Sequence, residues 1–181
     1  MKIVAFAGSN SSQSINKKLV KHALSYLELN NEIYLLDLNE FEMPIFSIDR
    51  ELFGYPPQVY LFRQQFENCD CIVVSLAENN KTYSAALKNI LDWCSRIDIN
   101  IFKNKPMFLM STSTGKHAGE QVMAAAKFFF PKAGATIIET FSLPSFENNF
   151  DESVGITNPE LKAEFEKKIQ GFKDYLSKPI I

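Results

Sequence analysis

The 181-residue chain carries a formal net charge of −2, with 46% hydrophobic and 22% charged residues. This composition is typical of a globular protein and predicts a single domain over residues 1–181. No block of like charges is present, so we expect neither nucleic acid nor a membrane surface as a partner. The apolar runs are only as long as strands, and the first residues begin a strand rather than a signal peptide, which predicts a cytoplasmic location.

The first 27 residues are predicted to form a strand, a polar loop and a helix. Residues 2–7 are apolar at nearly every position, as in a strand covered on both faces. From Asn16 to Leu27 apolar residues recur at helical spacing. The loop between them, GSNSSQS, places hydroxyls and backbone N–H groups at the positive end of the helix, which favours a bound phosphate. The alternative is that Ser14 only caps the helix.

Four more strands alternate with four more helices. We expect the strands at 32–37, 70–76, 105–111 and 136–141, and the helices at 57–68, 84–95, 119–130 and 158–176. Residues 44–56 and 142–157 lack periodicity and are predicted as surface loops. The alternation predicts an α/β fold with a five-stranded parallel sheet in the order 2-1-3-4-5.

Polar loops follow the first, third and fourth strands, and the second and third of these loops are residues 77–83 and 111–116. Because ligands bind at the carboxyl ends of parallel strands near the point where strand order reverses, we expect these loops to share one phosphorylated ligand. The loops contain neither GxxxxGK[ST] nor GxGxxG, which disfavours ATP and a Rossmann dinucleotide.

The cysteines and histidines give little sign of metal or redox chemistry. Cys69, Cys71 and Cys94 match no zinc or thioredoxin spacing, so we expect buried free thiols and no metal site. His22 falls on the polar side of the first helix, and we expect it to be a solvated surface residue. His117 lies at a predicted helix start, where it faces either water or a ligand.

With these loops in place, the sequence resembles the NADPH-dependent FMN reductase family of flavodoxin-like proteins. A first family signature, close to G-S-x-R-x-x-S-x-N-x-x-L, matches at Gly8, Ser9, Ser14, Asn16 and Leu19. A second, close to P-E-Y-N-x-S-x-P-x-x-L-K-N-x-x-D-W, matches at Glu78, Asn80, Leu87, Lys88, Asn89, Asp92 and Trp93. Residues 111–115 look like the family's third, Ser/Thr-Gly segment.

The resemblance implies a flavodoxin-like three-layer sandwich that binds FMN. Its implied cofactor-binding residues are Ser9, Ser11, Ser14, Ile15 and Asn16 near the phosphate, and Ala77, Glu78, Asn79, Asn80, Thr112, Ser113, Thr114 and Gly115 near the isoalloxazine. No residue is assigned a catalytic or metal-ligating role, because the cofactor performs the chemistry. For Glu78, contact with a ring edge and capping of the following helix both remain open.

Two departures from the signatures affect this implied site. Ser11 replaces the usual arginine, which removes a fixed charge from the phosphate site unless Lys17 reaches back to replace it. Asn79 replaces the usual tyrosine, which alters the surroundings of the ring. Trp93 is expected either to pack inside the chain or, with Phe102, to form a subunit contact. The resemblance implies a homodimer or homotetramer.

The resemblance implies an oxidoreductase that takes hydride from NADPH or NADH. The electrons then pass to a small-molecule acceptor, which is a quinone, an azo or nitro compound, a metal oxyanion or free flavin. A flavodoxin-like electron carrier and a non-catalytic flavin-binding regulator remain as alternatives.

Overall fold

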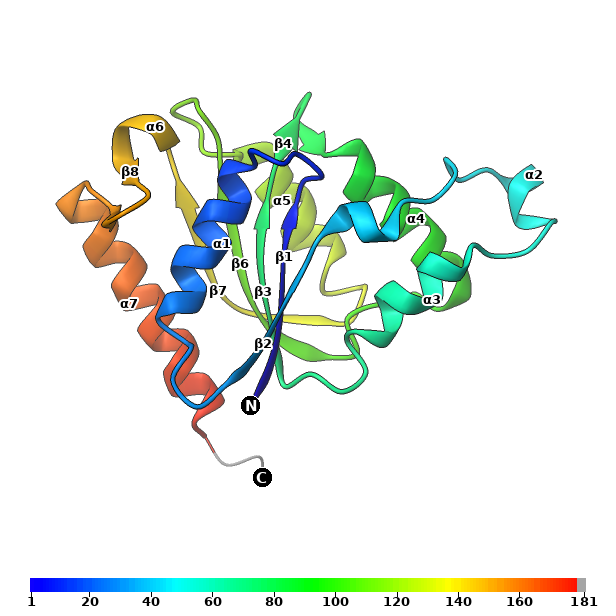
Figure 1. The fold of residues 1–181 in the computed structure, drawn as a ribbon, viewed down its shortest axis with the longest axis horizontal. Helices are drawn as coiled ribbons and strands as arrows, with labels where there is room; N and C mark the ends of the chain where they lie inside the picture. Colours follow the sequence, from blue (N-terminus) through cyan, green and yellow to red (C-terminus); the bar gives the residue numbers. More distant parts are fainter. Residues whose placement is uncertain (179–181) are drawn as a thin grey trace.

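The computed structural model describes residues 1–178, and its centre is one parallel sheet of five strands (Figure 1). The strands are β1 (Lys2–Gly8), β2 (Glu32–Leu36), β3 (Cys71–Leu76), β6 (Lys105–Thr112) and β7 (Ala135–Leu143). They lie in the order β2-β1-β3-β6-β7, and every pairing is parallel. This is the predicted 2-1-3-4-5 order, so the fold prediction is confirmed.

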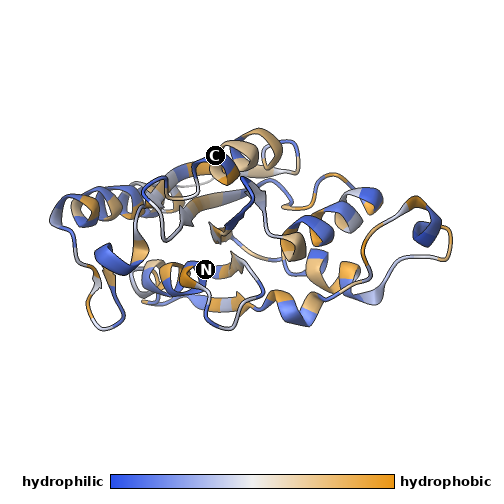
Figure 2. Ribbon diagram, turned by 90° about the horizontal axis from the view of Figure 1, so that it is seen from above, coloured by the Kyte–Doolittle hydropathy of each residue, from blue (hydrophilic) through white to orange (hydrophobic). Residues whose placement is uncertain are grey.

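Helices cover both faces of the sheet, which gives three layers. On one face lie α1 (Ile15–Ser25) and α7 (Pro159–Leu176), and on the other lie α3 (Pro57–Gln64), α4 (Ala85–Ile97), α5 (Glu120–Phe129) and the 3-10 turn η1 (Leu38–Phe41). Strand β1 shows why helices cover both faces of the sheet: its alternate residues are apolar and point to opposite faces. Val4 and Phe6 enter the core under α3 and α4, whereas Ile3 and Ala5 enter the core under α1 and α7. Figure 2 shows hydrophobic and hydrophilic residues alternating along the helices, as expected when each helix buries one face.

Several short elements lie in segments that we predicted as loops. They are α2 (Ile48–Glu51), the hairpin β4 (Glu78–Asn79) and β5 (Thr82–Tyr83), α6 (Phe146–Asn149), and the hairpin β8 (Phe150–Asp151) and β9 (Gly155–Ile156). Strand β7 is also longer than residues 136–141. Its register against β6 shifts between Met107 and Phe108, which pair with Ile137 and Glu139 and leave Ile138 without a partner on β6. Elements of two to four residues are too short to produce a periodic pattern, which is why the sequence does not reveal them.

The prediction that Trp93 and Phe102 form a subunit contact is wrong for this fold. Trp93 is 1% exposed and Phe102 is 0% exposed, so both belong to the interior of one chain. Segment 44–56 covers Trp93: the indole Nε1 donates to the carbonyl oxygen of Pro44 at 2.8 Å, and Phe46 and Tyr55 pack edge-on against the ring. This segment lies about 40 to 50 residues before Trp93, so local periodicity could not reveal the cover.

His22 is not the solvated surface residue that its place on α1 suggested. Its ring packs against Tyr26, Phe150 and Phe165 at centroid distances of 5.3, 5.6 and 5.0 Å. Burial lowers the pKa of His22, the positive charge of Lys162 lowers it further, and Glu166 opposes both. The polar side of α1 is covered here by the β8–β9 hairpin and α7. His117, by contrast, is 72% exposed in its side chain, so its exposure to water is confirmed.

The prediction of buried free thiols is confirmed, because Cys69, Cys71 and Cys94 are free and at most 1% exposed. Burial raises the pKa of Cys71 and of Cys94 to about 12, which keeps both thiols protonated and unreactive near neutral pH. Among residues 1–178, no helix combines the length and the apolar character that crossing a membrane requires.

Candidate functional site

The first polar loop, residues 9–14, is shaped by its own serine side chains. Ser9 Oγ accepts a hydrogen bond from the Ser11 N–H, Ser11 Oγ accepts from the Gln13 N–H, and Ser14 Oγ accepts from the Lys17 N–H, each at 3.2 Å. Ser14 therefore caps α1, as one of the two readings proposed. The hydroxyl protons of these serines are left to donate elsewhere, so capping and phosphate binding do not exclude one another.

Helix α1 begins with backbone N–H groups that find no acceptor in the described part of the chain. Within residues 1–178, the N–H groups of Ile15 and Asn16 have no hydrogen-bond acceptor. Such orphan donors lie at the positive end of the helix dipole and suit an anion. Together with the loop hydroxyls, they form a donor set that fits a phosphate group.

The Asn16 side chain joins the first loop to the third instead of facing a ligand. Its Nδ2 donates to the Thr112 carbonyl oxygen at 3.2 Å, and its Oδ1 accepts from the Thr112 N–H at 3.1 Å and from the Ser75 hydroxyl at 2.6 Å. All three residues are buried. Because Oδ1 and Nδ2 are both engaged inside the protein and the side chain is buried, the backbone N–H is the group by which Asn16 can meet a ligand.

The third loop, residues 111–116, is anchored by hydrogen bonds on its buried side and exposed on the other side. Thr112 is 1% exposed and its hydroxyl donates to the Leu143 carbonyl oxygen at 2.7 Å. The carbonyl oxygens of Ser113 and Gly115 accept from the N–H groups of Phe146 and Ser145. Thr114 and Gly115 are exposed, and a Cβ placed on Gly115 would have no neighbour closer than the Ser113 hydroxyl at 4.0 Å. A flat ring could therefore lie against this backbone.

The second loop is a tight antiparallel hairpin. Its turn residues, Asn80 and Lys81, have φ values of 49° and 65°, the left-handed pair that a two-residue hairpin turn requires. Ser84 ends the hairpin and caps α4, accepting from the Leu87 N–H at 3.2 Å. Asn79 and Asn80 are exposed, and Ala77 and Glu78 are half-buried.

Glu78 connects the second loop to the helix that follows the third. Its Oε2 accepts from the N–H groups of Gln121 and Val122 at 2.8 and 2.9 Å, which caps α5. Gly119, the residue before α5, has no side chain to do this. We expected Glu78 to contact the ring or to cap the following helix. The structure shows capping, but of α5 rather than of α4.

The turn after β2 supports the first loop from its outer side. Asn39 Nδ2 donates to the Asn10 carbonyl oxygen at 3.1 Å, and Lys17 Nζ pairs with Asp37 at 2.7 Å. The hydrogen bond from Lys17 lowers the pKa of Asp37. Lys17 thus binds a carboxylate instead of reaching back to replace the missing arginine. Sequence reasoning missed Asp37 and Asn39, although two polar residues directly after a strand were the available signal.

Two hollows flank the first loop. One, of about 230 Å³, lies between Asn10, η1 and the start of α4, and its apolar lining includes Phe41, Met43 and Ile90. The other, of about 560 Å³, lies between α1 and the β8–β9 hairpin and is bounded at one end by Ser12 and Ser14.

The predicted residues of the three loops lie at one edge of the sheet. Asn16 links the first loop to the third, and Glu78 links the second loop to α5.

Comparison with known proteins places the chain in a family. The sequence profile described as NADPH-dependent FMN reductase matches residues 1–148. An NAD(P)H-dependent FMN reductase of Pseudomonas aeruginosa is 29% identical over 64% of this chain and 62% of its own length. An NADPH:quinone oxidoreductase of Arabidopsis thaliana is 32% identical over 66% of this chain and 61% of its own length. The chain therefore spans about three fifths of the length of these relatives.

A solved structure supports the fold over a longer stretch. FerB, a flavoenzyme NAD(P)H:(acceptor) oxidoreductase from Paracoccus denitrificans, superposes with a TM-score of 0.76 at 22% identity, covering 97% of this chain and 96% of that one. The strand order and these likenesses make the fold flavodoxin-like. The family profile covers more than half of the chain, and on that ground the chain belongs to the NADPH-dependent FMN reductase family.

Proposed function

We propose that the chain is a flavodoxin-like FMN-binding domain that oxidises NADPH or NADH and passes the electrons to a small-molecule acceptor. The observation that carries this proposal is that side-chain hydrogen bonds hold three strand-end loops at one sheet edge, beside anion donors that have no acceptor within residues 1–178. Asn16 ties the first loop to the third, and Glu78 ties the second to α5. The family and the names of its members support the same assignment.

The residues present fit FMN. The hydroxyls of Ser9, Ser11 and Ser14 and the N–H groups of Ile15 and Asn16 would hold the phosphate. Residues 77–80 and 112–115 would border the isoalloxazine, with exposed amides and backbone groups available to its polar edge. When bound, FMN supplies the hydride-accepting and electron-donating chemistry. The chain itself would anchor, orient and enclose the FMN, so it needs no acid–base triad.

Ser11 and Asn79 define how this site differs from the family signatures. With Lys17 paired to Asp37, the phosphate would be held by neutral donors rather than by a fixed cation. We therefore propose weaker retention of FMN than in relatives that carry the arginine, because charge-assisted hydrogen bonds are roughly twice as strong as neutral ones.

We propose quinones as the acceptor class, because curated relatives are named quinone oxidoreductases and quinone reductases. Azo and nitro compounds, metal oxyanions and free flavin are the competing classes to assay beside them. The three free cysteines favour a reducing compartment, which supports a cytoplasmic location.

An absorbance experiment tests the proposed function. Purified protein, with FMN added in excess and then removed by desalting, should retain a flavin spectrum that NADPH or NADH bleaches under anaerobic conditions. Admitting a quinone should restore the colour. A yellow protein that neither nucleotide bleaches would instead support an electron carrier or a flavin-binding regulator, and a protein that never associates with FMN would refute the site.

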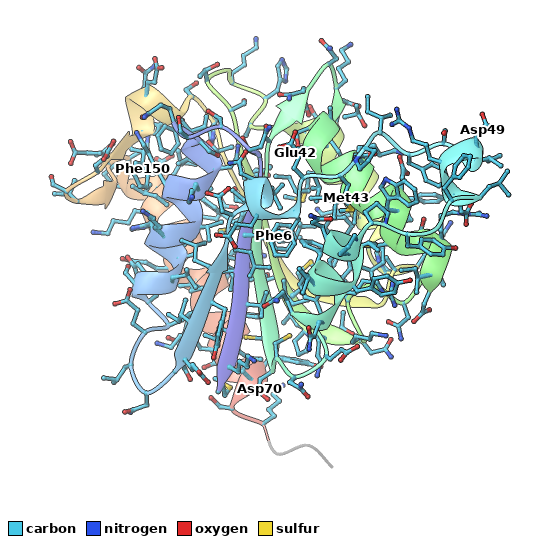
Figure 3. The ribbon with its side chains drawn as sticks, turned by 45° about the vertical axis from the view of Figure 1, so that its right-hand side comes forward. Phe6, Glu42, Met43, Asp49, Asp70 and Phe150 are labelled. Carbon is cyan, nitrogen blue, oxygen red and sulfur yellow. The ribbon has the colours of Figure 1, made fainter. Side chains whose placement is uncertain are left out.

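For the oligomer, we propose that segment 45–53 forms the contact between two copies of the chain. Figure 3 shows Asp49 at the tip of this projecting segment, far from Phe150. Its apolar side chains are unusually exposed: Ile45 by 77%, Ile48 by 71%, Leu52 by 80% and Phe53 by 93%. Exposed apolar patches mark interaction sites. Light scattering should show a dimer or tetramer that Leu52→Ser with Phe53→Ser dissociates, whereas Leu29→Ser, at a residue 87% exposed elsewhere, leaves it intact.

A further inference from the structure

The segment of residues 144–157, which contains α6 and the β8–β9 hairpin, holds the third loop in place. The Ser145 N–H donates to the Gly115 carbonyl oxygen at 2.9 Å. The Phe146 N–H donates to the Ser113 carbonyl oxygen at 3.0 Å. Ser113 and Gly115 are among the residues that would border the flavin ring. The backbone of this segment therefore fixes the part of the third loop against which the ring would lie.

The same segment rests on His22 of α1. Phe146 stacks on Phe150 at a centroid distance of 4.6 Å, and Phe150 meets the His22 ring edge-on at 5.6 Å. Gly155, on the other strand of the hairpin, lies so close to the imidazole that a Cβ there would be 2.2 Å from Cε1. In Figure 1, α1 lies beside β8 and α7. Contacts thus run from His22 through two phenylalanine rings to the third loop.

The surroundings of the His22 ring suit an imidazole without a charge. Its Nε2 is buried and has no hydrogen-bond partner within residues 1–178. Tyr26 and Phe165 enclose the ring at centroid distances of 5.3 and 5.0 Å. A protonated imidazole carries two N–H donors and a positive charge, and an apolar enclosure neither accepts the hydrogen bonds nor solvates the charge. The ring therefore takes up a proton more readily when the hairpin lifts and water reaches it.

The charged and titratable side chains near His22 do not supply the missing acceptor. They come from every element packed against the ring: Lys17, Lys18, Lys21 and Tyr26 of α1, Glu152 of the hairpin turn, and Lys162 and Glu166 of α7. Glu152 already pairs with Lys18, and Glu166 accepts from the Tyr26 hydroxyl at 3.4 Å. Burial and the positive charge of Lys162 lower the pKa of His22, whereas Glu166 raises it. The closed hairpin thus favours the neutral ring.

We propose that neutral His22 positions the flavin site: it holds the β8–β9 hairpin closed, and the closed hairpin holds the backbone of Ser113 and Gly115 in place for the ring. Protonation of His22 lets the hairpin open, which frees the third loop and speeds the release of FMN. This inference rests on the proposed function and adds a positioning residue that lies outside the three loops. With an ordinary pKa of 6.5 in the open hairpin, lowering the pH from 7.5 to 5.5 favours opening by up to about tenfold.

Hydrogen exchange of the flavin-free protein tests the link between His22 and the hairpin. The protection factors of the Ser145 and Phe146 N–H groups should fall about three- to tenfold between pH 7.5 and pH 5.5. They should change less than about twofold in His22→Gln, which cannot take up a proton, and in His22→Phe, which keeps an aromatic ring. The control is His117→Gln, at an exposed histidine, which should behave like the parent chain.

Three results of the exchange measurement would overturn the proposal. Two are unchanged protection in the parent chain and an equal loss of protection in His22→Gln, because either shows that the histidine does not govern the hairpin. The third is protection of Ser145 and Phe146 equal to that of the β3 N–H groups at both pH values. These groups would then exchange only on global unfolding, and the hairpin would not open by itself.

The release of FMN tests the positioning role. Dilution of the FMN-loaded protein in a stopped-flow fluorimeter gives the dissociation rate constant, which should rise about three- to tenfold more in the parent chain than in His22→Gln between pH 7.5 and pH 5.5. The FMN phosphate also titrates near pH 6, and comparing the two proteins removes its contribution. An equal pH dependence in both would overturn the positioning role.

The two experiments distinguish the two levels of inference. A protein that never binds FMN refutes the proposed function, and hydrogen exchange still accepts or rejects the link between His22 and the hairpin. A protein that binds FMN but shows no pH-dependent exchange at Ser145 and Phe146 refutes that link alone.

Discussion

The side-chain amide of Asn16 pairs with both backbone groups of Thr112, accepting from its N–H at 3.1 Å and donating to its carbonyl oxygen at 3.2 Å. These residues are 96 positions apart in the chain. The pair fixes the first loop against the third, and the Ser75 hydroxyl adds a bond from β3. One buried side chain therefore connects the ends of the three central strands.

Replacing Asn16 with alanine should destabilise the protein by about 3 kcal/mol. The change leaves the Thr112 N–H and carbonyl and the Ser75 hydroxyl buried without partners, and each such group costs about 1–3 kcal/mol before relaxation. Urea unfolding of the flavin-free protein measures the loss. Asn10→Ala, at an exposed side chain of the same loop, should shift the midpoint little. Equal midpoints for the two variants would show that the clamp does not stabilise the fold.

Ser14→Asp separates helix capping from phosphate binding. Aspartate caps helices as well as serine does, so the free energy of unfolding should change by less than about 0.5 kcal/mol. The added negative charge at the phosphate loop should nevertheless weaken FMN binding at least tenfold, measured by fluorescence titration. Ser14→Ala should instead lower the free energy of unfolding by about 1 kcal/mol, because alanine cannot cap the helix. If Ser14→Asp retains FMN as tightly as the unaltered protein, the loop does not hold the phosphate.

Glu78→Ala should cost about 1–2 kcal/mol of unfolding free energy without any flavin present. The reason is the loss of an N-terminal cap, because the Gln121 and Val122 N–H groups lose their acceptor. Glu78→Gln keeps an acceptor oxygen and should lose less. Chemical denaturation of the flavin-free protein checks both values. A Glu78→Ala variant that unfolds like the parent chain but binds FMN poorly would indicate that Glu78 contacts the flavin ring and does not stabilise α5.

The free energy of unfolding should decrease as the pH falls through the range in which His22 takes up a proton. Burial lowers the pKa of folded His22 below its ordinary value of 6.5, so below pH 6.5 the unfolded chain binds more protons than the folded one. The loss begins near pH 6.5 and is complete below the folded pKa. Unfolding free energies at pH 7.5 and 5.5 should differ more for the parent chain than for His22→Gln. His117→Gln, at an exposed histidine, should behave like the parent.

The positions of the loops at the proposed site were predictable because they follow from short-range pattern. Apolar runs over residues 3–7 and 71–76 indicate buried parallel strands, and the polar residues directly after them must lie at one sheet edge. The serine before the first helix was a recognisable cap for the same reason, since Ser14 and Lys17 are only three residues apart. Strand order then followed from the alternation of strands and helices.

Only the tertiary structure shows the contacts between residues that lie far apart in the chain. Glu78 caps α5 from 43 residues away, and Asn16 engages Thr112 instead of a ligand. Trp93 is covered by Pro44 and its neighbours, and His22 by a hairpin near residue 150. A local window records each side chain's polarity and spacing but not which distant donor or apolar surface the fold brings to it. The sequence alone therefore determined which edge of the sheet holds the candidate site, and the folded chain determined which side chains remain available there.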